Sequence, residues 1–348
     1  MNQAILCVFG TRPELIKLAP VIEALRGRGA EVVPLTTGQH ADLLDAETLN
    51  RVGTVPSLEV PSTTVLQFLT RARRKLHDVL AASTPLPACV VVQGDTMSGF
   101  VGAVVARALG IPVAHVEAGV RSGDVHDPWP EELIRVEIDR IATYRYAPTL
   151  HAAENLARER LESVVVGNTS VDALGGLRAL AVVDPTAPVV VTLHRREFYQ
   201  RADALAVMQA VFDAAHETRT RVVWPVHPAM VSLAKQLRIP YEVGARPPMS
   251  HKLMLDTLVG ARGVLTDSGG LVEEAATLGV PTVVLRNHTD RPEAETAGTA
   301  VRCAPTVAGV RDAFTILAQG KIPRIPTNVF GDGHAADRIA VHLLQRLI

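Results

Sequence analysis

The chain has 348 residues, and its 35 lysine and arginine residues nearly balance 36 aspartate and glutamate residues, giving a formal net charge of -1. This length favours two domains. The balanced charge argues against a surface that binds nucleic acid, and no apolar run approaches the ~20 residues that span a bilayer. The N-terminus lacks a secretory signal, and the three cysteines (Cys7, Cys89 and Cys303) have neither metal nor redox spacing, so we expect a cytoplasmic enzyme without structural metal.

Short apolar runs alternate with helical patterns through the first half of the chain. They predict buried parallel strands at 4–9, 31–37, 88–93, 112–116 and 163–167. After the first of these, leucine and isoleucine recur at helical spacing at Leu15, Leu18, Ile22 and Leu25. An alternating strand–helix order predicts a doubly wound α/β sheet.

A second α/β series follows a proline-containing break at 184–188. Its predicted strands lie at 189–193, 221–226, 263–267, 281–285 and 300–304. A proline-punctuated segment, 322–328, then leads to a last helix at 335–347. We therefore expect two Rossmann-like domains, 1–168 and 169–330, facing a central cleft, with 331–348 as a terminal helix that packs back on the first domain.

Carboxylates follow two neighbouring strands of the first half. Asp95 ends one strand, Glu117 ends the next, and Glu131 opens a helix with Arg135 four residues later. Two of them have a simpler explanation, since Asp95 could cap a helix and Glu131–Arg135 could be an i, i+4 helix pair worth about 0.5 kcal/mol or less. Because the carboxyl ends of parallel strands meet at one edge, the three acids together predict a site for proton transfer.

The segment after the first strand, FGTRPELIK (9–17), predicts an anion site. Thr11 and Glu14 have capping-box spacing and Pro13 suits the first turn, so a well-capped helix explains part of it. Helix capping does not account for Arg12, and an arginine at a helix N-terminus favours binding of an anion. The turn lacks the glycine pattern of dinucleotide sites, so we expect no such cofactor.

Two further segments suit phosphate binding. Ser268, Gly269 and Gly270 open a helix directly after a strand, where backbone N–H groups and the helix dipole attract anions; the alternative is a simple glycine-rich cap. Glu273 or Glu274, one turn on, could hold a ribose.

Two histidines also follow strands. His194 precedes two arginines, which favours phosphate contact or proton transfer over a structural role. For His227, flanked by prolines, structural and functional roles remain open.

Taken together, these segments resemble the non-hydrolysing UDP-N-acetylglucosamine 2-epimerases. The matching segments are collinear and cover nearly the whole chain: FGTRPELIKLAPVI (9–22), TGQH (37–40), QGDT (93–96), HVEAGVRSGD (115–124), PWPEELIR (128–135), GNTSVDAL (167–174), HRRE (194–197), PVHP (225–228), TDSGGLVEEA (266–275) and RPEAETAGT (291–299).

The resemblance implies a glycosyltransferase-B-like fold, a homodimer, a UDP-sugar substrate and no added cofactor. It implies reversible C2 epimerisation of UDP-N-acetylglucosamine through elimination and re-addition of UDP. Glu117 and Glu131 would transfer protons, and Asp95 would orient these two glutamates. His194 would assist departure of UDP. Substrate-binding roles would fall to Arg12, Lys17, Arg135, His227, Ser268, Gly269, Gly270, Glu274 and Arg291.

The chain departs from the family pattern where a second, activating UDP-N-acetylglucosamine is bound. Gln39 and His40 match, but Ala41 and Asp42 replace the usual residues, and 55–74 replaces the usual helix-bearing segment. We therefore expect a weakened or altered activator site. The open alternatives are a hydrolysing epimerase that releases N-acetylmannosamine and UDP, a glycosyltransferase of the same fold, and a catalytically silent nucleotide-sugar sensor.

Overall fold

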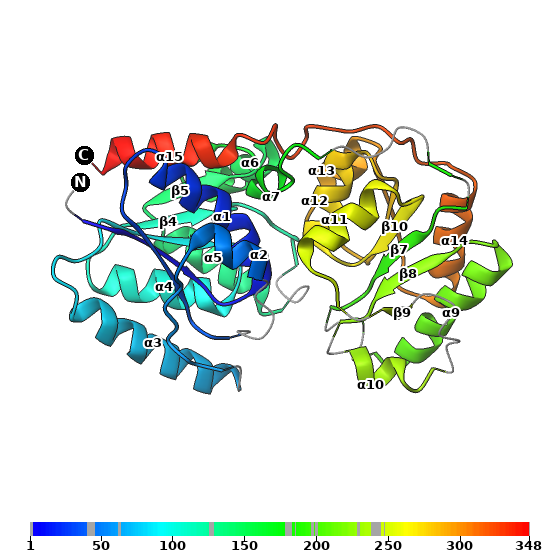
Figure 1. Ribbon diagram of the computed structural model, residues 1–348, viewed down its shortest axis with the longest axis horizontal. Coiled ribbons are helices and arrows are strands. Elements are labelled where there is room, and N and C mark those ends of the chain that lie inside the picture. Colours follow the sequence, from blue (N-terminus) through cyan, green and yellow to red (C-terminus); the bar gives the residue numbers. More distant parts are fainter. Residues whose placement is uncertain are drawn as a thin grey trace. The chain divides into compact units, whose positions relative to one another are not determined.

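The computed structural model describes residues 3–39, 46–61, 64–124, 129–177, 183–184, 186–195, 198, 201–227, 230–237, 245–246 and 248–347. The chain forms two compact units (Figure 1). Unit 1 comprises Met1–Gly175 and Gly331–Ile348, and unit 2 comprises Gly176–Phe330. Unit 1 thus includes the short helix α7 (Thr169–Ala173), which lies within the predicted second domain, 169–330.

Unit 1 is built on a six-stranded parallel sheet with the order β2-β1-β3-β4-β5-β6. In chain order its elements are β1 (Ile5–Phe9), α1 (Arg12–Arg26), β2 (Val32–Thr36), α2 (Ala46–Val52), α3 (Val65–Ala81), β3 (Cys89–Gln93), α4 (Met97–Ala108), β4 (Val113–Val116), α5 (Glu131–Ile141), β5 (Tyr144–Ala147), α6 (Leu150–Arg158), β6 (Val164–Val165), α7 and α15 (Ala335–Arg346).

Both faces of this sheet are buried, as the continuous apolar strands predict. Alternate residues of each strand point to opposite faces. On one face Cys7 and Val91 pack with α1 and α15, and on the other Val8 and Val92 pack with α3, α4 and α5. Figure 1 shows α1 and α15 on one side of the sheet and α3 and α4 on the other.

Helix α15 comes from the end of the chain yet belongs to the core of unit 1. Ile339, Ala340 and Leu343 are fully buried in the cluster that also contains the inward face of α1. The Asp172 carboxylate of α7 accepts the backbone N–H groups of Ala335 and Ala336 at 3.2 and 2.8 Å, and so caps the helix.

Unit 2 has a second six-stranded parallel sheet, with the order β12-β11-β10-β7-β8-β9. Its elements are β7 (Val189–Thr192), α9 (Ala204–Glu217), β8 (Val222–Pro225), α10 (Val231–Ala234), β9 (Ala245–Arg246), α11 (His251–Val259), β10 (Gly263–Thr266), α12 (Gly269–Leu278), β11 (Thr282–Leu285), α13 (Pro292–Thr296), β12 (Ala300–Cys303) and α14 (Val307–Ala318). Its core centres on Trp224 and Phe314, which are fully buried. None of the helices in the described residues is long and apolar enough to cross a bilayer.

We expect Ile339→Ala to lower the free energy of unfolding by about 2–5 kcal/mol, because it removes buried volume between α15 and the sheet. Val341 is 42% exposed on the same helix, so Val341→Ala should change stability by no more than about 0.5 kcal/mol. Urea denaturation followed by circular dichroism measures both. Equal effects of the two variants would contradict the burial of α15 in unit 1.

Candidate functional site

The strand order of unit 1 changes direction between β1 and β3, which are paired neighbours. Open α/β sheets bind ligands at such a switch point, beyond the carboxyl ends of the strands. Glu14 joins the two turns there. One carboxylate oxygen accepts the N–H groups of Gly10 and Thr11 at 3.0 and 2.8 Å, and the other accepts the hydroxyl of Thr96 at 2.6 Å. The capping-box spacing thus fixes Arg12, the first residue of α1, beside the turn that carries Asp95.

Gly10 allows the close approach of these segments. A Cβ atom there would lie 2.0 Å from Ser98 Oγ and 2.5 Å from Thr37 Oγ1, so a larger residue would displace both hydroxyl groups. The Ser98 hydroxyl donates to Gln39 Oε1 at 2.8 Å. Gln39 therefore lies beside the start of α4, while His40, Ala41 and Asp42 fall outside the described residues.

Glu117 follows β4 with a left-handed backbone, φ 69°, which is uncommon for a residue with a side chain. Lys17 Nζ and Gln93 Nε2 both donate to its Oε2 atom at 2.5 Å. The Glu117 side chain is 9% exposed. Lys17, which the resemblance assigns to substrate binding, is thus placed by the fold on this carboxylate. Glu117 is held at the strand end by a cation and an amide.

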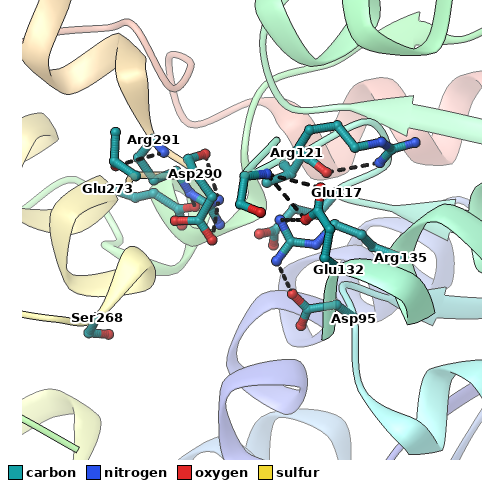
Figure 2. Close-up of polar contacts among 12 residues, drawn as sticks. Asp95, Glu117, Arg121, Glu132, Arg135, Ser268, Glu273, Asp290 and Arg291 are labelled. Carbon is teal, nitrogen blue, oxygen red and sulfur yellow. Dashed lines mark hydrogen bonds and ion pairs between the residues drawn. The ribbon is translucent and has the colours of Figure 1, made fainter. Parts of the chain in front are cut away.

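Helix α5 connects the other acids of this edge. Arg135 pairs with Asp95 through Nη2 and lies 3.4 Å from Glu132 through Nη1 (Figure 2). Glu132 in turn accepts the backbone N–H of Ser122 at 3.1 Å, which ties the loop after β4 to the helix. Glu131 is the first residue of α5 and is half-buried. Asp95, Glu117, Glu131 and Arg135 therefore belong to adjoining elements of one sheet edge.

Beneath these side chains lies a buried ionic network. His115 Nδ1 lies 2.7 Å from Asp139 Oδ1, and Asp139 Oδ2 accepts the N–H of Gly119 at 3.1 Å and pairs with Arg121 at 2.7 Å. Arg121 continues to Glu159 with contacts of 2.9 and 3.1 Å. Gly119 is required here, because its φ is 81° and a Cβ would lie 2.2 Å from Ala152 O.

In unit 2 the strand order changes direction between β7 and β10. His194 follows β7 and Asp267 follows β10. Asp267 Oδ2 accepts the backbone N–H groups of His194 and Arg195 at 2.8 and 2.9 Å, and Oδ1 lies 3.1 Å from His194 Nδ1. Burial raises the pKa of Asp267, but the charge and hydrogen bond of His194, together with Arg195, outweigh burial and hold this pKa below its usual value. Asp267 thereby orients a histidine whose side chain is 37% exposed.

The first turn of α12 lies next to this pair. Ser268 is the N-cap and accepts the N–H of Leu271, while a Cβ on Gly270 would meet nothing within 4 Å. Arg291 lies beside Gly269, since a Cβ there would come within 3.6 Å of its guanidinium. The Arg291 Nε donates to buried Glu273, and Nη1 donates to Asp290 O at 3.0 Å (Figure 2). A helix N-terminus beside a fixed guanidinium is an arrangement that favours anions.

Two further candidates, His227 and Glu274, lie in unit 2. His227 follows β8, and its ring centroid lies 5.5 Å from that of His194. Glu274 Oε1 accepts a hydrogen bond from His251 Nε2 at 2.7 Å. Glu274 keeps 8% of its surface exposed, whereas Glu273 is fully buried. Among the residues described in the structure, no group of three or more His, Cys, Asp or Glu side chains could hold a metal ion.

Sequence reasoning missed three residues that the structure brings into these sites: Glu132, Asp139 and Asp267. Glu132 stands next to Glu131 and three residues before Arg135, a spacing that could have indicated it. Asp267 directly precedes the glycine-rich turn, where a helix cap is the simplest interpretation of an aspartate. Nothing in the local pattern connects Asp139 with His115.

The chain is similar to known proteins over almost its full length. The model of the UDP-N-acetylglucosamine 2-epimerase family matches residues 23–344. The UDP-N-acetylglucosamine 2-epimerase of Salmonella typhimurium is 34% identical over 368 residues, covering 96% of each chain. A crystal structure of the Methanocaldococcus jannaschii UDP-GlcNAc 2-epimerase in complex with UDP-GlcNAc and UDP superposes with a TM-score of 0.89 at 32% identity, covering 99% of this chain and 100% of that one.

The Neisseria meningitidis UDP-GlcNAc 2-epimerase bound to UDP-GlcNAc also has a TM-score of 0.89, at 28% identity, covering 99% of this chain and 100% of that one. The two parallel sheets and these neighbours define a glycosyltransferase-B-like fold. The chain therefore belongs to the UDP-N-acetylglucosamine 2-epimerase family of isomerases.

Proposed function

We propose that the protein interconverts UDP-N-acetylglucosamine and UDP-N-acetylmannosamine without hydrolysis. The observation that carries the proposal is the set of acids at one sheet edge, where Lys17 and Gln93 hold Glu117 and Arg135 holds Asp95. Inversion of a carbon through a planar intermediate needs a proton removed from one face and returned to the other. Several carboxylates at one edge supply such groups.

The reaction balances without an oxidant or reductant. One carboxylate removes the C2 proton as the bond from C1 to the UDP oxygen breaks, which leaves 2-acetamidoglucal and UDP. The same oxygen then attacks C1 while a second carboxylic acid protonates C2 from the opposite face. We assign the two transfers to Glu117 and Glu131, and an orienting role to Asp95 through its pair with Arg135.

Unit 2 is suited to the leaving group. Departure of UDP places negative charge on the diphosphate, and fixed donors at that position stabilise it. His194, oriented by Asp267, and the Ser268–Gly270 turn next to Arg291 supply such donors. Glu274 is assigned to the ribose, and His227, beside His194, to the nucleotide. Arg12 and Lys17 remain assigned to the sugar-phosphate side.

We further propose that the protein acts as a cytoplasmic homodimer that binds no nucleic acid. Cys7, Cys89 and Cys303 are all free thiols, which suits a reducing compartment. The family resemblance supports the homodimer, and the balanced charge of the chain supports the absence of a nucleic-acid partner.

Proton NMR with UDP-N-acetylglucosamine in deuterated water tests the reaction. We expect a UDP-N-acetylmannosamine signal with deuterium at C2. Glu117→Gln should lower kcat by about 10²–10⁴-fold, because the amide cannot exchange a proton as the carboxylate does. Glu137→Gln, at an exposed position of α5, is the matched control and should retain full activity.

Other products would change the assignment. Free N-acetylmannosamine with UDP would indicate a hydrolysing epimerase. Absence of exchange at C2 would refute epimerisation of this substrate and favour a glycosyltransferase or a nucleotide-sugar sensor.

His194→Gln should reduce kcat by about 10²–10³-fold, because it removes a donor from the departing diphosphate. His216→Gln, at an exposed position of α9, is the control and should have no effect. Initial rates at saturating UDP-N-acetylglucosamine measure both. A normal kcat for His194→Gln would remove His194 from the chemical step.

The segment around Gln39 concerns activation by UDP-N-acetylglucosamine. Gln39 is engaged by Ser98 within unit 1, and the chain around it departs from the family pattern. We expect UDP-N-acetylmannosamine to be epimerised at a similar rate with and without a trace of UDP-N-acetylglucosamine. Strict dependence of the initial rate on that trace would show that activation is retained.

A further inference from the structure

His115 is a fully buried histidine that the reaction described above does not use. It lies on β4, two residues before Glu117, and neither it nor Asp139 has exposed surface. Its Nδ1 lies 2.7 Å from Asp139 Oδ1, and its Nε2 lies 2.8 Å from the carbonyl oxygen of Gly94. Both ring nitrogens therefore face oxygen atoms at hydrogen-bond distance.

These partners determine the protonation of the ring. The carbonyl of Gly94 can only accept, so Nε2 must carry a proton. Asp139 is ionised, because its second oxygen accepts from Gly119 N at 3.1 Å and pairs with Arg121 at 2.7 Å. Nδ1 must then carry a proton as well, since a bare nitrogen facing a carboxylate would leave two acceptors in contact. His115 is thus an imidazolium.

The charges around the ring are consistent with this state. Burial raises the pKa of Asp139, but the charges and hydrogen bonds of His115 and Arg121 outweigh burial and hold this pKa below its usual value. Glu159 pairs with Arg121 at 2.9 Å, and Arg145 Nε donates to the Asp139 carbonyl at 2.5 Å. Arg121 therefore pairs with two carboxylates, those of Asp139 and Glu159.

The contacts of this pair reach both turns that carry the acids. Gly94, bound by Nε2, directly precedes Asp95. Gly119, bound by Asp139, lies two residues after Glu117. Asp139 also lies one helical turn after Arg135, which pairs with Asp95. The imidazolium and its carboxylate thus connect the ends of β3 and β4 to α5.

We propose that His115 and Asp139 are positioning residues, a buried imidazolium–carboxylate pair that fixes Asp95 and Glu117 at the geometry that proton transfer requires. The inference rests on the proposed function, since it deepens the roles given there to the two acids. A displacement of about 1 Å at a reacting group can cost about 10²-fold in rate, so loss of the pair should reduce turnover rather than substrate affinity.

Nitrogen NMR of the wild-type enzyme labelled with ¹⁵N-histidine tests the charge directly. The buried ring of His115 is assigned from its nuclear Overhauser contacts to Gly94. We expect both ring nitrogens to carry slowly exchanging protons at neutral pH. A neutral ring with one bare nitrogen would overturn the proposal, and this measurement requires neither a variant nor activity.

Asp139→Asn tests the positioning role, because it removes the negative charge with little change of shape. We expect kcat to fall about 10²-fold with an unchanged KM for UDP-N-acetylglucosamine. The matched control is Asp172→Asn, another carboxylate of unit 1 that binds backbone N–H groups, but at α15. It should lower thermal stability and leave kcat unchanged.

The outcomes separate the two proposals. C2 deuterium exchange in the wild type together with an unchanged kcat for Asp139→Asn would overturn the positioning role alone. Absence of exchange in the wild type would overturn the proposed function, whatever the NMR shows of His115. If Asp139→Asn does not fold, Asp139→Glu replaces it; it keeps the charge but shifts the carboxylate, and a normal kcat for a folded Asp139→Glu would likewise count against positioning.

Discussion

The site in unit 1 depends on the backbone of Glu117. A non-glycine residue with φ of 69° is strained by about 1–3 kcal/mol, and such a conformation persists only where surrounding contacts determine it. Here Lys17 and Gln93 hold the side chain, and Ala118 N donates to Tyr146 O at 3.0 Å immediately afterwards. These contacts hold the carboxylate at the strand end while the chain turns toward Gly119. The position of the carboxylate thus depends on both the strand and the turn that follows it.

Sequence reasoning predicted most of the fold because buried parallel strands are continuous apolar runs. It missed β5 (Tyr144–Ala147), whose sequence YRYA mixes aromatic and charged residues. Its tyrosines pack against His342 of α15, at ring-centroid distances of 6.2 and 5.6 Å, and Arg145 donates to the Asp139 carbonyl. These partners are remote in sequence, so no local pattern could reveal them. Strand β9, of two residues, is too short for periodicity to indicate.

In the site, too, local sequence predicts the positions of residues but not their distant partners. The positions of Asp95, Glu117 and Ser268 follow from one rule, that polar residues after parallel strands meet at an edge. The partners of these residues do not follow from it. Asp267 and His194 are 73 residues apart, and Lys17 and Glu117 are 100 residues apart. Two neighbouring glutamates also differ in burial: Glu273 is enclosed with Arg291, whereas Glu274 keeps some exposure.

The return of α15 to unit 1 has a consequence for biosynthesis. The polypeptide leaves the ribosome from its N-terminus, but Ile339 and Leu343 complete the apolar layer over β1 and β3. Unit 1 therefore cannot close its core until nearly the whole chain has been translated, whereas all strands of unit 2 precede α15. Unit 1 is thus the first to be translated and the last to complete its core. During that interval one face of its sheet is uncovered, and a chain that terminates before α15 leaves the core of unit 1 incomplete while unit 2 keeps its full sequence.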